Sequence, residues 1–314
     1  MRDPYVLVTG GAGYVGSHVC KALAGAGYTP VVYDSLVTGH RWAVQWGPLE
    51  LGDVCDRARL CEVMRKYGPD AVMHFAALSS VREGEENPQA FYDVNVTGSL
   101  NLLTAAKQAA VGRIVFSSTA AVYGGPTELP IRETERALPV NVYGRTKLGA
   151  ENAITDFCTA YGCGGVILRY FNAAGADPDG EIGEDHRPET HLVPRVLMAA
   201  GGAIDALPVY GDDFETRDGT AIRDYVQVCD LAQAHVSALD VPLDREAPFA
   251  IYNLGSRRGA SVYEVVSAVE RWTGITVPIT VGPRRSGDPP ALVADPSRAE
   301  CDLGWIPRES DLTT

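Results

Sequence analysis

The sequence predicts an α/β fold, in which a doubly wound parallel sheet is joined to a smaller, loop-rich C-terminal part. Short runs rich in Val and Ile alternate with longer amphipathic stretches from residue 5 to about residue 170. The apolar runs show no polar alternation, which is typical of parallel strands covered by helices on both faces. The 314-residue chain is 46% hydrophobic, which is enough for a full core in one large or two intimate domains.

The elements follow in order along the chain. Apolar runs predict strands over 5–9, 30–33, 71–76, 113–117 and 165–170. Periodic stretches predict helices over 14–26, 57–67, 88–110 and 144–161. Segment 173–222 is rich in Gly, Pro, Asp and Glu, which favours loops that shape a ligand site. A strand over 250–254 and a helix over 261–272 come next. We therefore expect a first domain over 1–172, to which 223–255 returns, and an interleaved second domain over 173–314.

Composition excludes several classes of protein and of site. The net charge of −13 argues against a nucleic-acid partner, which requires a basic face. The apolar runs are too short to span a bilayer, and the N-terminus enters a strand without a signal-peptide pattern. Seven cysteines without Cys-x-x-Cys spacing indicate reduced thiols and a cytoplasmic location. The six histidines show no His-x-His or His-x-x-x-His pair, so we expect no metal site.

A glycine-rich turn follows the first predicted strand directly. Gly10, Gly13 and Gly16 have the Gly-x-x-Gly-x-x-Gly spacing, and a helix begins within the motif. Glycines at these positions let a diphosphate approach the backbone at the positive end of the helix. The pattern predicts a Rossmann-type dinucleotide-binding domain at the N-terminus.

Two carboxylates refine this prediction. Asp34 ends the second predicted strand, where it can accept hydrogen bonds from both ribose hydroxyls and repel a 2′-phosphate. NAD is therefore expected in preference to NADP. Asp53 follows the next strand, where it either faces the adenine amino group or caps the helix that begins near Asp56.

Tyr143 and Lys147 form a Tyr-x-x-x-Lys pair, which places both side chains on one face of a helix. A phenol with a pKa of about 10 is a poor base at neutral pH. An ammonium one turn away in a dry site would lower the phenol pKa by stabilising the phenolate. Such a pair can remove a proton from a sugar hydroxyl.

Together these residues resemble the extended short-chain dehydrogenase/reductase family, and within it the UDP-glucose 4-epimerases. The resemblance runs over essentially the whole chain. It includes the segments 74–77 (HFAA), 115–119 (VFSST), 168–172 (LRYFN), 219–225 (GTAIRDY) and 283–288 (PRRSGD). It also implies a last helix beyond Trp305, after which this chain soon stops.

The resemblance implies a role for each matching residue. Tyr143 is the base, Lys147 holds the nicotinamide ribose, and the Thr119 hydroxyl bonds the sugar oxygen. Tyr170 and Phe171 pack near the nicotinamide, and Asn95 supports the Tyr–Lys pair. The implied NAD-binding residues are Gly10, Gly13, Tyr14, Val15, Gly16, Asp34, Ser35, Asp53, Val54, Phe75, Ala76, Ala77, Ser79, Asn95, Ser117, Tyr143, Lys147 and Tyr170.

The same resemblance implies a UDP-sugar site that grips the nucleotide firmly and the sugar loosely. Asn172, Arg223 and Arg285 match positions that hold the diphosphate, and arginine suits bidentate binding. Asp288 matches a ligand of the uridine ribose. The full set of implied substrate residues is Thr119, Tyr143, Asn172, His191, Leu192, Val209, Tyr210, Arg223, Arg285, Asp288 and Leu292.

The implied reaction oxidises carbon 4 of the sugar, lets the 4-keto sugar swing over, and returns the hydride to the opposite face. Homodimers form in the family through two helices per subunit, here expected near 88–110 and 144–161. UDP-glucose and UDP-galactose are the expected substrates, and UDP-xylose/UDP-arabinose and UDP-N-acetylglucosamine stay open.

Three positions depart from the family pattern. Ser79 replaces a lysine near the cofactor phosphates, and His191 replaces an asparagine that contacts the substrate. Leu292 stands where some members carry a bulky aromatic that excludes N-acetylated sugars.

Two other functions compete with an epimerase. A dehydratase or decarboxylase starts with the same oxidation, and dehydratases place carboxylates directly after the active-site Thr. Here Thr119 is followed by Ala120 and Ala121, so elimination lacks its acid. A non-catalytic NAD(P)-sensing regulator would need neither Tyr143 nor Lys147.

Overall fold

The computed structural model describes residues 4–126, 128–285, 288–308 and 310. Its main sheet has seven strands in the order β10-β6-β5-β4-β1-β2-β3, and every neighbouring pair is parallel. The strands are β1 (Tyr5–Thr9), β2 (Thr29–Asp34), β3 (Leu49–Leu51), β4 (Ala71–His74), β5 (Arg113–Thr119), β6 (Gly164–Tyr170) and β10 (Phe249–Leu254). The predicted parallel α/β fold is confirmed.

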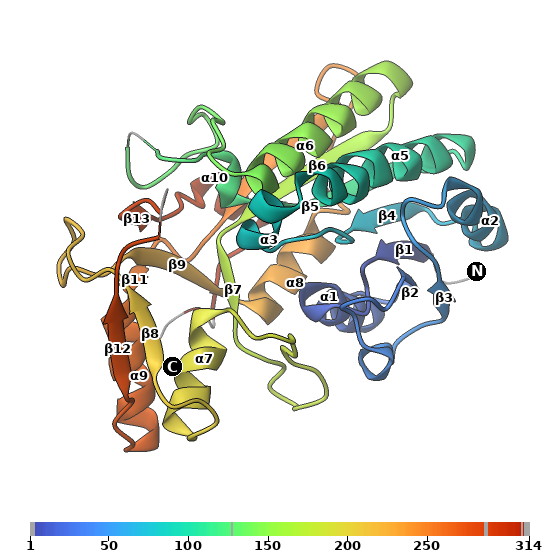
Figure 1. Cartoon of the computed structure of the whole chain (residues 1–314). Helices are drawn as coiled ribbons and strands as arrows, with labels where there is room; N and C mark the ends of the chain where they lie inside the picture. The colour runs from blue at the N-terminus through green and yellow to red at the C-terminus, as the bar shows by residue number, and fades with distance from the viewer. Residues whose placement is uncertain (1–3, 127, 286–287, 309, 311–314) are drawn as a thin grey trace.

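Helices cover both faces of this sheet (Figure 1). The helices α1 (Tyr14–Gly25) and α8 (Val228–Ser237) pack together on one face. The other face carries α2 (Arg57–Tyr67), α5 (Gly98–Gln108) and α6 (Val142–Tyr161). The burial of β1 shows why its central residues have no polar alternation. Val6 and Val8 lie in the core on the α1–α8 side of the sheet, and Leu7 lies in the core on the side of α2, α5 and α6. A strand buried on both sides needs apolar side chains at every position.

The helix expected over 88–110 is interrupted. It consists of α4 (Pro88–Tyr92), a π-helical turn η2 (Asp93–Thr97) and α5, and the short α3 (Val81–Glu86) precedes it. Asn87 accepts a hydrogen bond from the Ala90 amide and so caps α4. The π-helical turn contains the buried Asn95, and such turns are frequent at functional sites.

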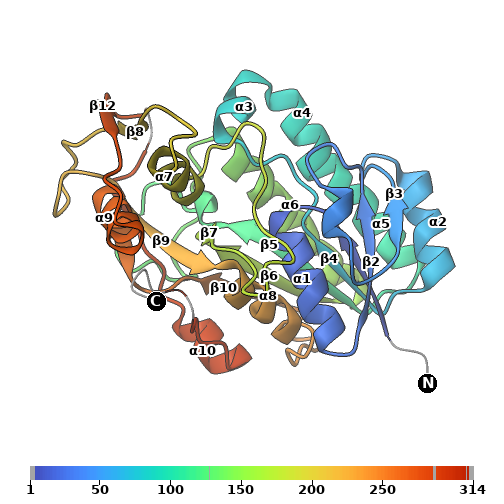
Figure 2. The ribbon, with the colours of Figure 1, turned by 90° about the horizontal axis from the view of Figure 1, so that it is seen from below.

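Apart from β10 and α8, which belong to the main sheet and its covering helices, most segments after β6 lie to one side of that sheet (Figure 2). A four-stranded sheet contains β7 (Asn172–Ala174), β9 (Ile222–Gln227), β11 (Gly259–Ser261) and β13 (Ala291–Leu292). A two-stranded sheet pairs β8 (Leu207–Tyr210) with β12 (Ile279–Gly282). The helices α7 (Leu192–Ala200) and α9 (Val262–Thr273) share a core with β8, and α10 (Ser297–Leu303) lies beside β10.

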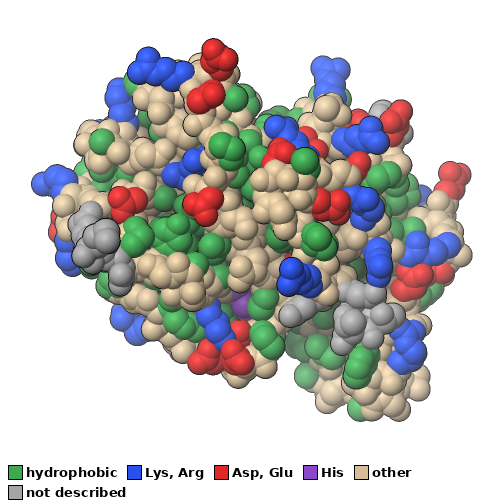
Figure 3. Space-filling view, turned by 180° about the vertical axis from the view of Figure 1, so that it is seen from behind, with side chains coloured by type: hydrophobic (Ala, Val, Ile, Leu, Met, Phe, Trp, Pro, Cys, Tyr) green, Lys and Arg blue, Asp and Glu red, His purple; other side chains and the backbone are tan. Residues whose placement is uncertain are grey.

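Segment 173–222 therefore holds α7, β8 and most of β7 where the composition predicted loops. The short 3₁₀ turns η1 (Arg41–Ala43) and η3 (Ala120–Val122) complete the described elements. Among the described residues, none of the helices has both the length and the apolar character to cross a membrane. Acidic and basic side chains are interspersed over the described part of the face in Figure 3.

Candidate active site

Three predicted site residues, Asp34, Thr119 and Tyr170, lie at the carboxyl ends of the parallel strands. The sheet order reverses between β1 and β4, since the chain continues from β1 to β2 on one side and reaches β4 on the other. Ligands of doubly wound sheets bind in the crevice at such a switch point. Thr9, Asp34, His74, Thr119 and Tyr170 are the last residues of five adjacent strands.

The glycine loop between β1 and α1 is too tight for side chains. A Cβ on Gly16 would lie 2.2 Å from the Gly10 carbonyl oxygen, and a Cβ on Gly10 would lie 2.6 Å from the Ala76 nitrogen. Gly10 also has a φ of +74°, a conformation that favours glycine. Within the described residues no side chain caps α1 at Gly13, so the first amides of the helix can receive a phosphate. This loop fits a dinucleotide diphosphate.

The Asp34 carboxylate is oriented by two backbone amides. Its oxygens accept hydrogen bonds from Ala12 at 3.0 Å and Leu36 at 2.8 Å. A carboxylate has about four acceptor positions, which leaves capacity for ribose hydroxyls. The exposed Ser35 follows it.

Asp53 is exposed in the loop between β3 and α2, and Val54 next to it is buried. Asp53 accepts from the Cys55 amide at 2.8 Å, whereas Asp56 accepts from the Arg59 amide and is the N-cap of α2. Of the two roles left open for Asp53, the helix cap belongs to Asp56.

A segment distant in sequence lies against the glycine loop and α1. We call residues 175–191 the covering segment. The Tyr14 hydroxyl donates to the Gly175 carbonyl at 2.6 Å, and Lys21 of α1 pairs with Asp177 at 2.8 Å. His40 contacts the Asp185 carbonyl oxygen at 2.9 Å. Tyr14, which follows the second motif glycine, thus links the predicted cofactor loop to the covering segment.

The Tyr-x-x-x-Lys pair lies in the first turns of α6. Asn141 caps this helix by accepting from the Gly144 amide at 2.8 Å. The Thr119 hydroxyl at the end of β5 hydrogen-bonds the phenol of Tyr143. Lys147 is 3% exposed, and its Nζ lies 4.4 Å from the centroid of the Phe116 ring. The fold therefore brings Thr119, Tyr143 and Lys147 to one place.

Burial governs the protonation of this pair. It raises the pKa of the Tyr143 phenol, and the Thr119 hydrogen bond only partly offsets that rise. Burial also lowers the pKa of Lys147 to about 7, although the Glu151 carboxylate opposes this shift. In the chain by itself the net pKa of Tyr143 is thus raised, because desolvation disfavours both charged forms, and the lowering effect of Lys147 on the Tyr143 pKa stays a prediction.

A buried ion-pair network behind Lys147 was absent from the sequence prediction. Glu151, one turn further along α6, receives Arg169 Nε at 2.9 Å and Nη2 at 2.6 Å, and it also accepts from the Ser118 hydroxyl. Arg169 donates in addition to the Tyr123 hydroxyl at 3.0 Å. The available signals were the i,i+4 spacing from Lys147 and an arginine within the apolar run of β6, since a buried charge requires a partner.

Asn95 connects α6 to the loop after β4. Its amide nitrogen donates to the Leu78 carbonyl at 2.9 Å and to the Thr146 hydroxyl at 3.0 Å, and its oxygen accepts from the Leu78 amide. This loop carries Phe75, Ala76, Ala77 and the exposed Ser79. Asn95 thereby ties the predicted cofactor loop to the helix turn that bears Tyr143 and Lys147.

The aromatic residues at the end of β6 are also held in place. Ser117 and the Tyr170 hydroxyl are hydrogen-bonded at 2.6 Å across β5 and β6. Phe171 is buried in a separate cluster with Tyr123 and Ile131. Tyr170 therefore stands at the strand ends, where the nicotinamide is predicted to lie.

The predicted diphosphate and uridine residues pair with one another. Arg223 of β9 donates to Asp288 at 3.2 Å and to the Pro289 carbonyl at 3.0 Å. The Arg285 guanidinium lies 3.9 Å from the Tyr210 ring centroid, over an exposed ring. Both arginines thus come from the predicted substrate side, and each has a local partner.

The remaining substrate-side residues divide between surface and core. Asn172 is exposed at the start of β7, and Leu292 of β13 lies opposite Arg223 in the strand pairing. The Val209 side chain is 1% exposed and belongs to the α7–α9 core, so only its backbone can face a ligand. A cavity of about 380 Å³ is lined by residues 125, 126, 129 and 289–291, the last of which precedes Leu292 in the chain.

His191 and Leu192 lie at the start of α7. His191 Nδ1 contacts Glu184 at 2.7 Å and Glu189 at 3.0 Å, and Leu192 is partly buried. The carboxylates raise the pKa of His191. His191 is therefore paired with two carboxylates of its own segment.

Comparison with known proteins reveals extensive similarity. The profile of the NAD dependent epimerase/dehydratase family matches residues 6–255. A UDP-glucose 4-epimerase of Rhizobium leguminosarum bv. trifolii is 49% identical over 308 residues, which cover 98% of this chain and 94% of the relative.

Solved structures are similar along the whole chain. The UDP-glucose 4-epimerase of Brucella ovis, in complex with NAD, has a TM-score of 0.95 and 53% identity, with 99% of this chain and 95% of the other covered. A UDP-glucose-4-epimerase from Stenotrophomonas maltophila, with bound NAD and formylated UDP-arabinopyranose, has a TM-score of 0.93 and 41% identity, with 99% and 95% covered.

Proposed function

Because the chain belongs to the NAD dependent epimerase/dehydratase family, we propose that it inverts carbon 4 of a UDP-sugar, with UDP-glucose and UDP-galactose as substrates. One observation carries the proposal above all others. The phenol of Tyr143 is hydrogen-bonded to Thr119 at the carboxyl end of β5, and Lys147 follows Tyr143 by one turn of α6.

The residues present fit NAD as the cofactor. The side-chain-free loop at Gly10 and Gly16 and the uncapped start of α1 suit the diphosphate, and the Asp34 carboxylate suits an unphosphorylated ribose. Lys147 and Tyr170 would hold the nicotinamide end. NAD, when bound, supplies a hydride acceptor for carbon 4 and returns the hydride.

The chain's own residues manage the proton and the sugar. Tyr143 takes the proton of the 4-hydroxyl when carbon 4 is oxidised and gives it back when carbon 4 is reduced. Thr119, whose hydroxyl already bonds the phenol, orients the sugar oxygen. Lys147 carries positive charge next to the phenolate, and Glu151 favours that charge.

Inversion requires a fixed nucleotide and a mobile sugar. Arg223, Arg285 and Asn172 would bind the diphosphate, and Asp288 the uridine ribose. Arg223 can exchange its contact with Asp288 for the more highly charged diphosphate, which arginine binds in bidentate fashion. The backbone of Val209 and the ring of Tyr210 would lie along the uracil.

The residues after Thr119 favour epimerisation over elimination. Ala120 and Ala121 form η3, and the Ala121 amide donates to Thr119 at 3.1 Å. Neither side chain can act as the acid that loss of water requires. The 4-keto sugar therefore has re-reduction as its catalysed outcome.

The sugar specificity rests on Leu292. It is partly buried and smaller than the aromatic side chain that some members of the family carry at this position, so the site would also accept UDP-N-acetylglucosamine. Pentose substrates such as UDP-xylose require less space still.

The chain organisation and assembly are part of the same proposal. Residues 1–172 and about 223–255 would form the NAD-binding domain, and the remainder the UDP-sugar domain. A homodimer would form through the helices within 88–110 and 144–161, which are α4, α5 and α6. The seven free cysteines fit a reducing cytoplasm.

Substitution of Tyr143 tests the proposed chemistry. Tyr143→Phe removes the proton-carrying oxygen and keeps the ring. Turnover of UDP-galactose should fall by a factor of about 1,000, in the range for loss of an acid–base group. Binding of NAD, measured by fluorescence or by released nucleotide, should persist. Unchanged turnover would remove Tyr143 from the mechanism, and lost NAD binding would show a damaged fold.

A further inference from the structure

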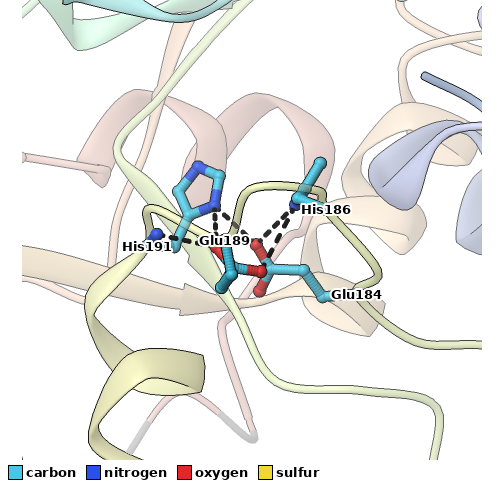
Figure 4. A group of neighbouring side chains, drawn as sticks. All are labelled: Glu184, His186, Glu189 and His191. Atoms are coloured by element: carbon cyan, nitrogen blue, oxygen red, sulfur yellow. Dashed lines mark hydrogen bonds and ion pairs between the residues drawn. The ribbon is translucent and has the colours of Figure 1, made fainter. Parts of the chain in front are cut away.

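The covering segment carries a compact group of four donor side chains. Glu184, His186, Glu189 and His191 follow an E-x-H-x-x-E-x-H spacing, and their donor atoms all lie within 4.8 Å of one another. Figure 4 shows both imidazoles turned toward the two carboxylates. The group is separate from Thr119, Tyr143 and Lys147 and lies directly before α7 begins at Leu192.

The distances within the group match those between ligands of one small ion. His186 Nδ1 is 3.1 Å from Glu184 Oε1 and 3.7 Å from Glu189 Oε2. His191 Nδ1 is 2.7 Å from Glu184 Oε1 and 3.0 Å from Glu189 Oε1. Four ligands about 2.0–2.1 Å from a tetrahedral ion lie about 3.3–3.4 Å apart. The observed separations bracket that value.

Burial and charge favour a cation at the centre of the group. The Glu184 and Glu189 side chains are only 7% and 9% exposed, so two carboxylates are held close together with little water. A divalent ion with two carboxylates and two neutral imidazoles gives a site of zero net charge. The His186 and His191 side chains are 31% and 49% exposed, which leaves an entry path.

We propose that Glu184, His186, Glu189 and His191 form a binding site for a divalent transition-metal ion of the Zn²⁺ class. Imidazole nitrogen and carboxylate oxygen in tetrahedral arrangement are the donors that Zn²⁺ accepts, whereas Ca²⁺ and Mg²⁺ require more oxygens. The proposal does not depend on the Tyr143 chemistry, although it includes His191 of the implied substrate residues, and it differs from the expectation of no metal site. That expectation counted histidine pairs alone and left out the intervening glutamates.

A bound ion would link His186 to His191, near the C-terminal end of the covering segment. His186 lies edge-on to Tyr14 of the glycine loop at 6.3 Å between ring centroids, and His191 is the residue before α7. The ion would therefore fix the segment between the cofactor loop and the substrate-side helix, and it would stabilise the folded chain by mass action.

Cobalt(II) is the probe, because its visible absorption reports coordination geometry. Full-length protein, stripped with a chelator and dialysed, should bind one Co²⁺ per chain at micromolar free metal, with an intense tetrahedral spectrum. Zn²⁺ should displace it and raise the thermal midpoint. The variant Glu184→Gln/Glu189→Gln should lose the spectrum and the thermal shift.

A matched control lies in the same segment. Asp179→Asn/Glu181→Gln also removes two carboxylates, but from a separate group that pairs with Lys21, and it should keep the Co²⁺ spectrum. If the first variant fails to fold, His186→Asn should weaken Co²⁺ binding by about 100-fold or more in a folded protein.

Four results would overturn the proposal. These are absence of binding to the wild type at micromolar metal, the weak spectrum of octahedral Co²⁺, a near-ultraviolet thiolate-to-cobalt band that assigns the ion to cysteines, and equal loss in the Asp179/Glu181 control. Absence of binding would leave the group as a network of hydrogen bonds between imidazoles and carboxylates.

Discussion

Replacement of Glu151 by Gln tests whether the buried network behind Lys147 serves both the fold and the reaction. The Glu151 and Arg169 side chains are 2% and 6% exposed, and two hydrogen bonds join them. A glutamine keeps the shape but removes the charge, and its amide group faces the guanidinium donors. Breaking one side of such a buried pair costs about 3–5 kcal/mol, because the remaining charge stays buried without compensation.

The second change, Arg169→Met, makes the magnitude interpretable. The double variant Glu151→Gln/Arg169→Met removes both charges, so it should recover at least about 2 kcal/mol of the free energy of unfolding that the single variant loses. Urea unfolding measures each free energy. Asp156→Asn, an exposed carboxylate on the same helix, is the control and should change stability by less than about 0.5 kcal/mol.

The catalytic readout separates positioning from stability. Glu151 raises the pKa of Lys147 against the effect of burial, so its loss should lower that pKa further below about 7. Lys147 is charged only below its pKa, and the alkaline limb of the kcat profile should shift to lower pH in Glu151→Gln. A single variant that loses under 1 kcal/mol, or an unshifted profile in a folded variant, would refute the role assigned to Glu151.

Three further predictions concern the core, the sugar and the cofactor. His235 is fully buried and its pKa is lowered to about 4; the unfolded chain takes up its proton near pH 6.5, so the free energy of unfolding should fall by about 3 kcal/mol between pH 6.5 and 4. His235→Leu should remove that part of the slope in denaturant titrations, and an unchanged slope would assign it elsewhere. Leu292→Tyr should abolish turnover of UDP-N-acetylglucosamine and spare UDP-glucose; equal effects on both sugars would contradict the role of Leu292. Asp34→Asn should raise NADP affinity relative to NAD by about 10-fold or more, since it removes a charge that repels a 2′-phosphate, and an unchanged ratio in binding titrations would argue against this role.

The strands and long helices were predictable because their burial leaves a direct pattern in the sequence. The three central residues of β1, Val6, Leu7 and Val8, are all apolar since both faces of the strand are covered. In contrast, β13 has two residues and β3 three, which is too short for any periodicity. Helix α7 carries Pro194 within its first turn, where proline is tolerated, and its sequence neighbours are loop-forming residues.

The site residues were predictable where a local spacing reports the geometry. Tyr143, Lys147 and the glycines lie on single turns, so their spacing implies their proximity. The Glu151–Arg169 pair depends on β6 lying beside α6, and the protonation of Lys147 depends on the depth of burial, which no spacing expresses. The same limit applies to the group at Glu184, whose donors meet only because the chain bends within the segment.

The central claim is that hydride leaves carbon 4 and returns to the same carbon. UDP-galactose that carries deuterium at carbon 4 can be incubated with the protein and its bound nucleotide, and the products analysed by NMR. The proposed function predicts UDP-glucose with deuterium retained at carbon 4 and no accumulation of a 4-keto-6-deoxy sugar. Loss of the label to solvent, or formation of the deoxy sugar, would contradict it.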